Sequence, residues 1–169
     1  MSVTGCHHTG FQVADLARSL AFYRDLLGFE VVWERVVSVE YLERIVGYPG
    51  LEMHQAMLRV PGSEHCLELL DYRNVERTPV DTRTANPGTA HICLIVEDLP
   101  GLYARLLEAG VRFVSEPVTP TVGPNTGRLV NYMIDPDGIR VELLQLEPAG
   151  ADLARSSGAA RGAGPEGAV

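Results

Sequence analysis

The chain has few of the features that mark membrane or nucleic-acid-binding proteins. None of its apolar runs reaches the length of about 20 residues that crosses a bilayer, and its first ten residues have neither a basic stretch nor an apolar core typical of a secretory signal. Its 14 Lys and Arg residues form no cluster, and they are outnumbered by 22 Asp and Glu residues. We therefore expect a cytoplasmic protein that binds neither membranes nor nucleic acids.

Cysteine is also scarce, and its spacing fits neither a disulfide framework nor a zinc motif. The three cysteines are Cys6, Cys66 and Cys93, an odd number without a C-x-x-C pair. Such usage is typical of reduced intracellular thiols. Large apolar side chains are scarce over residues 149–169, where Gly and Ala dominate. Such a segment buries too little surface to offset its ordering entropy, so we expect a disordered tail there.

What the chain does have is an internal repeat. The stretches HTGFQVADL at 8–16 and HICLIVEDL at 91–99 both run from a His through an apolar segment to Asp-Leu. Each is followed by a helical pattern that an Asp begins and a Gly ends. These residues are Asp15 and Gly28 in the first copy, and Asp98 and Gly110 in the second. The repeat therefore predicts the same strand and helix twice.

Three extended segments follow each of these helices. They are 29–37, 54–60 and 65–72 in the first copy, and 111–118, 128–134 and 139–146 in the second. We therefore predict an α+β protein of two tandem βαβββ modules, over residues 1–73 and 89–148. The segment 74–88 links them within one folding unit. An insertion at 38–52 is expected to form a short helix that ends near Gly47.

Each copy has a His seven residues before its capping Asp, and a Glu between apolar residues in its last strand. These are His8 and Glu68 in the first copy, and His91 and Glu142 in the second. A carboxylate on a covered face of a sheet is costly unless a cation lies beside it. A single His in a strand is more often packed or on the surface than a ligand, but four residues at matching positions predict one divalent ion: Zn, Ni, Co, Mn or Fe(II).

At this point the chain resembles the vicinal oxygen chelate superfamily, which includes glyoxalase I, methylmalonyl-CoA epimerase and the extradiol dioxygenases. The resemblance covers about residues 5–147, and the stretches that carry it are HHTGFQVADLARSLAFYRDLLGF, LELLDY, GTAHICLIVEDL and YMIDPDGIRVELLQ. It implies that the two modules form a U-shaped mixed sheet around a metal site, and that the chain forms a homodimer. It also implies the metal ligands, which are His8, Glu68, His91 and Glu142.

The number of ligands separates the chemistries of this superfamily. Oxygen-activating Fe(II) sites use two His and one carboxylate, whereas this chain offers a fourth ligand, Glu68. The pattern is similar to that of glyoxalase I and the epimerases. We therefore expect an enzyme, a metal-dependent isomerase, epimerase or lyase, that acts on a small substrate with vicinal oxygens through a metal-stabilised enediolate. The resemblance favours Glu142 as the catalytic base, and Glu68 is the other candidate.

Two alternatives of other classes stay open: an Fe(II) ring-cleaving dioxygenase of the extradiol type, and a metal-free drug-binding resistance protein. Five polar side chains are candidates for substrate contacts: Gln12, Arg59, Tyr72, Asn131 and Tyr132. The sequence does not relate the strand faces of Arg59 and Asn131 to those of the predicted ligands. The insertion at 38–52 is expected to form part of the mouth of the site.

Overall fold

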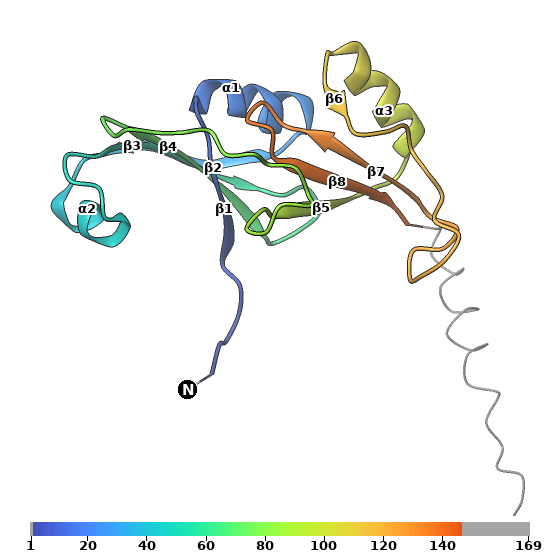
Figure 1. The fold of residues 1–169 in the computed structure, drawn as a ribbon, viewed down its shortest axis with the longest axis horizontal. Helices are drawn as coiled ribbons and strands as arrows, with labels where there is room; N and C mark the ends of the chain where they lie inside the picture. The colour runs from blue at the N-terminus through green and yellow to red at the C-terminus, as the bar shows by residue number, and fades with distance from the viewer. Residues whose placement is uncertain (1, 147–169) are drawn as a thin grey trace, which may run out of the picture. The chain divides into compact units, whose positions relative to one another are not determined.

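The computed structural model describes residues 2–146, and its elements follow the predicted repeat (Figure 1). The first copy contains β1 (His8–Gln12), α1 (Leu16–Leu20), the π-helical turn η1 (Ala21–Leu26), β2 (Glu30–Val37), α2 (Glu40–Val46), β3 (Glu52–Arg59) and β4 (Cys66–Arg73). The second contains β5 (His91–Val96), α3 (Leu99–Glu108), β6 (Arg112–Phe113), β7 (Leu129–Ile134) and β8 (Arg140–Gln145). The predicted α+β class with two βαβββ modules is confirmed. The expected tail at 149–169 lies outside the described residues.

Each module builds its own four-stranded sheet. The strand orders are β1-β4-β3-β2 and β5-β8-β7-β6. In the first sheet β1 runs parallel to β4, and the other neighbours are antiparallel. Among the described residues, the chain divides into two compact units, one that runs to His91 and includes Ile134–Arg140, and one that comprises Ile92–Met133 and residues 141–146.

Side-chain alternation gives the first sheet two different faces. One face carries Phe11, Leu67 and Leu69, which are almost fully buried beneath α1 and η1. The helix begins where the sequence predicts, because the Asp15 carboxylate accepts a hydrogen bond of 3.0 Å from the backbone N–H of Arg18. The other face of the sheet carries the residues at even positions of β1 and β4. Those positions include the predicted ligands.

The DPDG turn before β8 belongs to the first unit, although it lies in the second copy of the repeat. The Tyr23 hydroxyl donates a 2.9 Å hydrogen bond to the buried carboxylate of Asp135. The carboxylate of Asp137 accepts from the backbone N–H of Ala14 at 3.1 Å and from the guanidinium of Arg18 at 2.5 Å. The helix of the first module therefore holds this turn in place.

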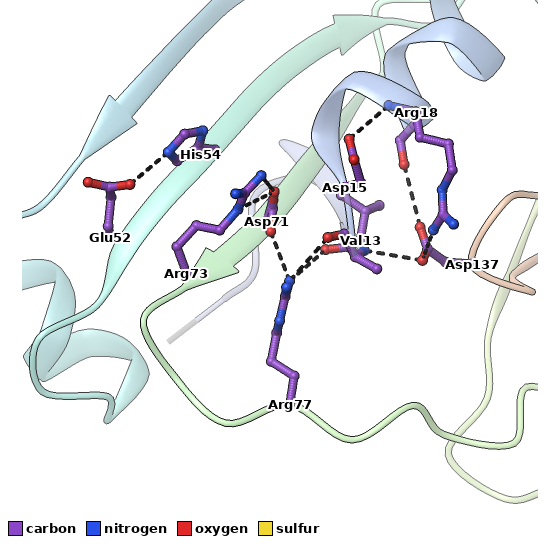
Figure 2. Close-up of polar contacts among 11 residues, drawn as sticks. Val13, Asp15, Arg18, Glu52, His54, Asp71, Arg73, Arg77 and Asp137 are labelled. Atoms are coloured by element: carbon purple, nitrogen blue, oxygen red, sulfur yellow. Dashed lines mark hydrogen bonds and ion pairs between the residues drawn. The ribbon is translucent and has the colours of Figure 1, made fainter.

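A second polar network ties the chain after β4 to the start of α1 (Figure 2). Asp71 is fully buried, and its carboxylate accepts hydrogen bonds from Arg73 at 2.7 Å and from Arg77 at 2.8 Å. Arg77 also reaches the backbone oxygen of Val13, at 3.4 Å. Two cationic partners stabilise the buried charge of Asp71. Since one of them, Arg77, also binds the backbone of Val13, the network joins the end of β1 to the end of β4.

One predicted strand of the second module is much shorter than expected. The pattern at 111–118 predicts a continuous strand, but β6 covers only Arg112 and Phe113, and pairing resumes at an isolated bridge between Val118 and Val130. Val114 donates to the backbone oxygen of Tyr132 and Val118 to that of Val130, so a step of four residues in this segment faces a step of two in β7, and regular pairing is interrupted between them. In the part of the chain that the structure describes, no helix has both the length and the apolar character needed to span a membrane.

Candidate metal and substrate site

The first module brings two predicted ligands into contact. The register of β1 and β4 aligns His8 with Cys66 and Gly10 with Glu68, so both side chains lie on the face away from α1. Nε2 of His8 is 3.1 Å from Oε2 of Glu68. The two side chains are 37% and 16% exposed, so the pair is sheltered but open to a ligand.

The separation of these two atoms fits a pair of ligands on one ion. Two donors about 2.1 Å from a divalent ion, with an angle of 90–110° between them, lie roughly 3.0–3.4 Å apart. The other ring nitrogen of His8, Nδ1, is 2.7 Å from Nδ1 of His7. A partner at Nδ1 holds the ring so that Nε2 faces the carboxylate. His7 is thus a supporting residue that the repeat pattern does not single out.

The second module has His91 and Glu142 at the corresponding positions. His91 begins β5 as His8 begins β1, and Glu142 is the third residue of β8 as Glu68 is the third of β4. The strand β5 is the neighbour of β8, just as β1 is the neighbour of β4. The predicted equivalence of the two repeats therefore holds in the positions of all four residues within their own strands.

Glu142 has neutral hydrogen-bond donors beside it. The Tyr132 hydroxyl, from β7, donates to Oε2 of Glu142 at 3.2 Å. Burial and the charge of Glu142 raise the pKa of that hydroxyl. Burial of the Cys93 thiol, followed by the charge of Glu142 and a hydrogen bond to it, raises the thiol pKa to about 11. At neutral pH both groups are therefore protonated and can donate to the carboxylate.

The neighbour of Glu68 on the next strand is different. In the register of β3 and β4, Met57 lies directly opposite Glu68, and its side chain is 5% exposed. An apolar side chain thus adjoins the first carboxylate, whereas a hydroxyl adjoins the second. The two halves of the repeat therefore surround their carboxylates with different chemistry.

Within residues 2–146, no three or more His, Cys, Asp or Glu side chains are gathered closely enough to form a metal-binding group. Among the predicted ligands, the structure brings His8 and Glu68 together. The set of four ligands therefore stays a prediction. The fit of one pair to adjacent coordination positions is the structural observation in its favour.

Two predicted substrate contacts lie beside this pair. Gln12, Glu68 and Tyr72 occupy the same face of neighbouring strands. Burial and the nearby charges raise the pKa of the Tyr72 hydroxyl, while a hydrogen bond from the Gln12 side chain acts in the opposite direction. The ring of Tyr48, from the 38–52 insertion, meets the ring of Tyr72 edge-on with centroids 5.9 Å apart. Tyr48 was not among the residues predicted from the sequence.

The structure also supplies the strand faces that the sequence left open. Arg59 lies opposite Cys66, which puts it on the face of Glu68, and its guanidinium is 3.2 Å from Glu64. Asn131 is 2% exposed on the face opposite to that of Tyr132, and its side-chain atoms have no hydrogen-bond partner among the described residues. The roles of Arg59 and Asn131 in substrate binding stay predictions.

Comparison with known proteins gives consistent matches. The sequence profile of the Glyoxalase/Bleomycin resistance protein/Dioxygenase superfamily matches residues 5–143. A 2-epi-5-epi-valiolone epimerase from Actinomyces sp. is 30% identical over 86% of this chain and 80% of its own length. A lactoylglutathione lyase from Salmonella typhimurium is 28% identical over 86% of this chain and 96% of its own. A solved glyoxalase family protein from Bacillus cereus has the same fold, with a TM-score of 0.70 at 20% identity, over 86% of this chain and 95% of that one.

Proposed function

Because the chain belongs to the Glyoxalase/Bleomycin resistance protein/Dioxygenase superfamily, we propose that it is a metal-dependent isomerase, epimerase or lyase. Its substrate is a small molecule with neighbouring oxygen atoms. The observation that carries the proposal is the contact of His8 with Glu68 at 3.1 Å, in a repeat that has His91 and Glu142 at matching positions. The names of the epimerase and the lyase among the relatives support the same reaction class.

Four residues would hold the ion: His8, Glu68, His91 and Glu142. Two imidazoles and two carboxylates suit Zn, Ni, Co, Mn or Fe(II), and they leave positions at which substrate oxygens can bind. A divalent ion bound there supplies positive charge that lowers the cost of negative charge on a substrate oxygen during proton removal.

The side chains of the protein carry the proton. We assign Glu142 as the base that takes a proton from the carbon beside the substrate carbonyl, and that returns it to the same or the adjacent carbon. Tyr132 donates a hydrogen bond of 3.2 Å to Oε2 of Glu142, which orients the carboxylate for proton transfer. Return to the same carbon gives epimerisation, and return to its neighbour gives isomerisation. Neither outcome needs a redox cofactor.

The proposal is tested by metal content and by exchange of carbon-bound protons. Purified protein is analysed for metals, and exchange of protons next to the carbonyl of hydroxyketones is followed in D2O by NMR. We expect about one divalent ion per chain. We expect the Glu142→Gln variant to lose exchange and to retain less metal, because an amide is a poor base and a weaker ligand. Glu108→Gln, at an exposed position of α3, is the matched control.

The same experiment is run with and without oxygen. Proton exchange that persists under anaerobic conditions supports the proposed reaction class, because ring cleavage by a dioxygenase requires oxygen. Activity that disappears without oxygen would favour the dioxygenase. A protein without bound metal, or a Glu142→Gln variant that exchanges protons at the wild-type rate, would contradict the proposal.

A further inference from the structure

We infer that Gln12, Tyr48 and Tyr72 form a neutral binding subsite beside Glu68, here called the tyrosine subsite. It selects substrates whose uncharged hydroxyl or carbonyl oxygens lie on a compact carbon frame. The inference rests on the proposed function for the role of Glu68, and it adds the class of substrate that this site accepts.

The strand register places the tyrosine subsite next to the predicted ligands. Along β4, Glu68 and Tyr72 are four residues apart and therefore lie on the same face, with Leu70 between them. Gln12 of β1 is aligned with Leu70, so its side chain projects from the same face. A substrate held at Glu68 can thus extend along β4 toward Gln12 and Tyr72.

The insertion supplies the third member. Tyr48 follows the helix α2, and its ring packs edge-on against Tyr72, with 5.9 Å between the ring centroids. Figure 1 shows α1 and α2 on opposite sides of the first sheet. The contact of Tyr48 with Tyr72 places the end of the insertion beside the strand face that carries Glu68.

The exposure of these side chains suits ligand binding. Tyr48 is 46% exposed despite its contact with Tyr72. The Tyr72 side chain is half-buried, and it lies on the same face as Gln12. Phenol hydroxyls and an amide can each donate and accept, so the cluster can bind either hydroxyl or carbonyl oxygens. The two rings also offer apolar area for a carbon frame.

The charges around the subsite argue against an anionic substrate arm in this direction. Its three members are neutral, and the charged group beside them is the carboxylate of Glu68. An anion placed there would have no cationic partner within the subsite, and the charge of a divalent ion held at Glu68 would already be balanced by two carboxylates. The cation Arg35 is aligned with Gln55, farther across the same sheet, and it stacks over Trp33 at 4.4 Å from the ring centroid.

The test uses two probes of different length on the full chain. Both are neutral hydroxyketones: inosose is a six-membered ring with several hydroxyl groups, and dihydroxyacetone is a three-carbon chain. Binding of inosose to chelator-treated protein is measured by saturation-transfer NMR, which requires neither metal nor turnover. Proton exchange of both probes is then measured on the metal-loaded protein, with the methylglyoxal–glutathione hemithioacetal as an anionic competitor.

We expect Tyr72→Phe and Tyr48→Phe each to weaken inosose binding up to about tenfold, since each removes one hydrogen bond. We expect both variants to have a smaller effect on the proton exchange of dihydroxyacetone, because this probe has fewer oxygens to bind at the subsite than inosose has. The metal content should stay within about twofold of wild type, because neither hydroxyl is a predicted ligand. The control Tyr103→Phe alters a tyrosine of α3 that packs on Phe113. We expect it to change neither probe.

Each outcome decides between the two claims. Two results overturn the tyrosine subsite but leave the proposed reaction intact. One is that Tyr72→Phe and Tyr48→Phe leave inosose binding unchanged, and the other is that the anionic hemithioacetal binds more strongly than inosose. If both variants weaken inosose binding but the metal-loaded wild type exchanges protons of neither probe, the subsite is supported and the proposed reaction is contradicted. Absence of inosose binding by the wild type overturns the subsite.

Discussion

At the scale of single residues, the two predicted metal-binding carboxylates have unequal neighbours. Glu142 accepts a hydrogen bond from Tyr132, while Glu68 adjoins the apolar side chain of Met57. A carboxylate held by a neutral donor keeps one orientation, which favours proton transfer to and from a fixed position. The geometry therefore distinguishes the two halves of a site that the repeat alone would make symmetrical.

The variant Tyr132→Phe tests this role. It removes the donor to Oε2 of Glu142 but keeps the ring, so the fold should be retained. We expect kcat for proton exchange to fall about tenfold, the lower end of the effect of residues that orient metal ligands. We expect KM to change much less if Tyr132 acts through Glu142, whereas a rise in KM of about tenfold would assign Tyr132 the substrate contact that the sequence predicts. A loss of Tm with unchanged kcat would assign Tyr132 a structural role only.

Element boundaries depend on how each segment is capped and paired. The helices begin after Asp15 and Asp98 as predicted, because a capping carboxylate acts on the N–H groups of the next turn. The strand predicted at 111–118 is largely wrong, because its pairing with β7 is interrupted between Val114 and Val118. Local signals therefore define these helices, while an edge strand also needs a continuous partner.

The DPDG turn shows how an element acquires a distant anchor. Asp135 is 1% exposed and accepts hydrogen bonds from the backbone N–H of Ile139 at 2.7 Å and from the Tyr23 hydroxyl at 2.9 Å. Burial raises the pKa of Asp135, and these hydrogen bonds oppose the rise only in part. Ionisation of Asp135 therefore lowers the free energy of unfolding, because the charged carboxylate is buried and the protonated one is neutral.

This effect predicts a pH dependence of stability. The pKa of Asp135 is higher in the folded protein than in the unfolded chain, where it is near 4. Its protonated form therefore stabilises the fold below about pH 4, and this contribution to the free energy of unfolding is lost as the pH rises through the pKa of the folded protein. We expect Asp135→Asn to remove this dependence, so its free energy of unfolding should improve relative to wild type between pH 4 and pH 7. Urea unfolding at both pH values measures it, with Glu108→Gln as the control. A constant difference between Asp135→Asn and wild type would refute the assignment.

At the scale of the whole molecule, metal binding and stability are linked. A ligand that binds only the folded protein, present at 100 times its Kd, stabilises it by about 2.7 kcal/mol. For a chain of this size we therefore expect a saturating divalent ion to raise the Tm of chelator-treated protein by roughly 5–10 °C. Thermal unfolding with Zn, Ni, Co and Mn in turn measures the effect and identifies the preferred ion.

Variants on both repeats show whether one ion links them. Glu68 belongs to the first compact unit and Glu142 to the second. If both hold the same ion, Glu68→Gln and Glu142→Gln should each reduce the metal-induced rise in Tm, and the double variant should abolish it. A rise that depends on only one of the two residues would exclude a site shared by the repeats.

The repeat, the capped helices and the equivalent positions of the two His and two Glu residues can be read from the sequence alone, because periodicity and capping act between residues close in the chain. Three contacts became known only from the folded chain: Arg59 shares the face of Glu68, Tyr48 meets Tyr72, and Tyr132 rather than an apolar residue adjoins Glu142. These contacts join distant segments. They depend on strand register and on the path of the insertion, which no local pattern specifies.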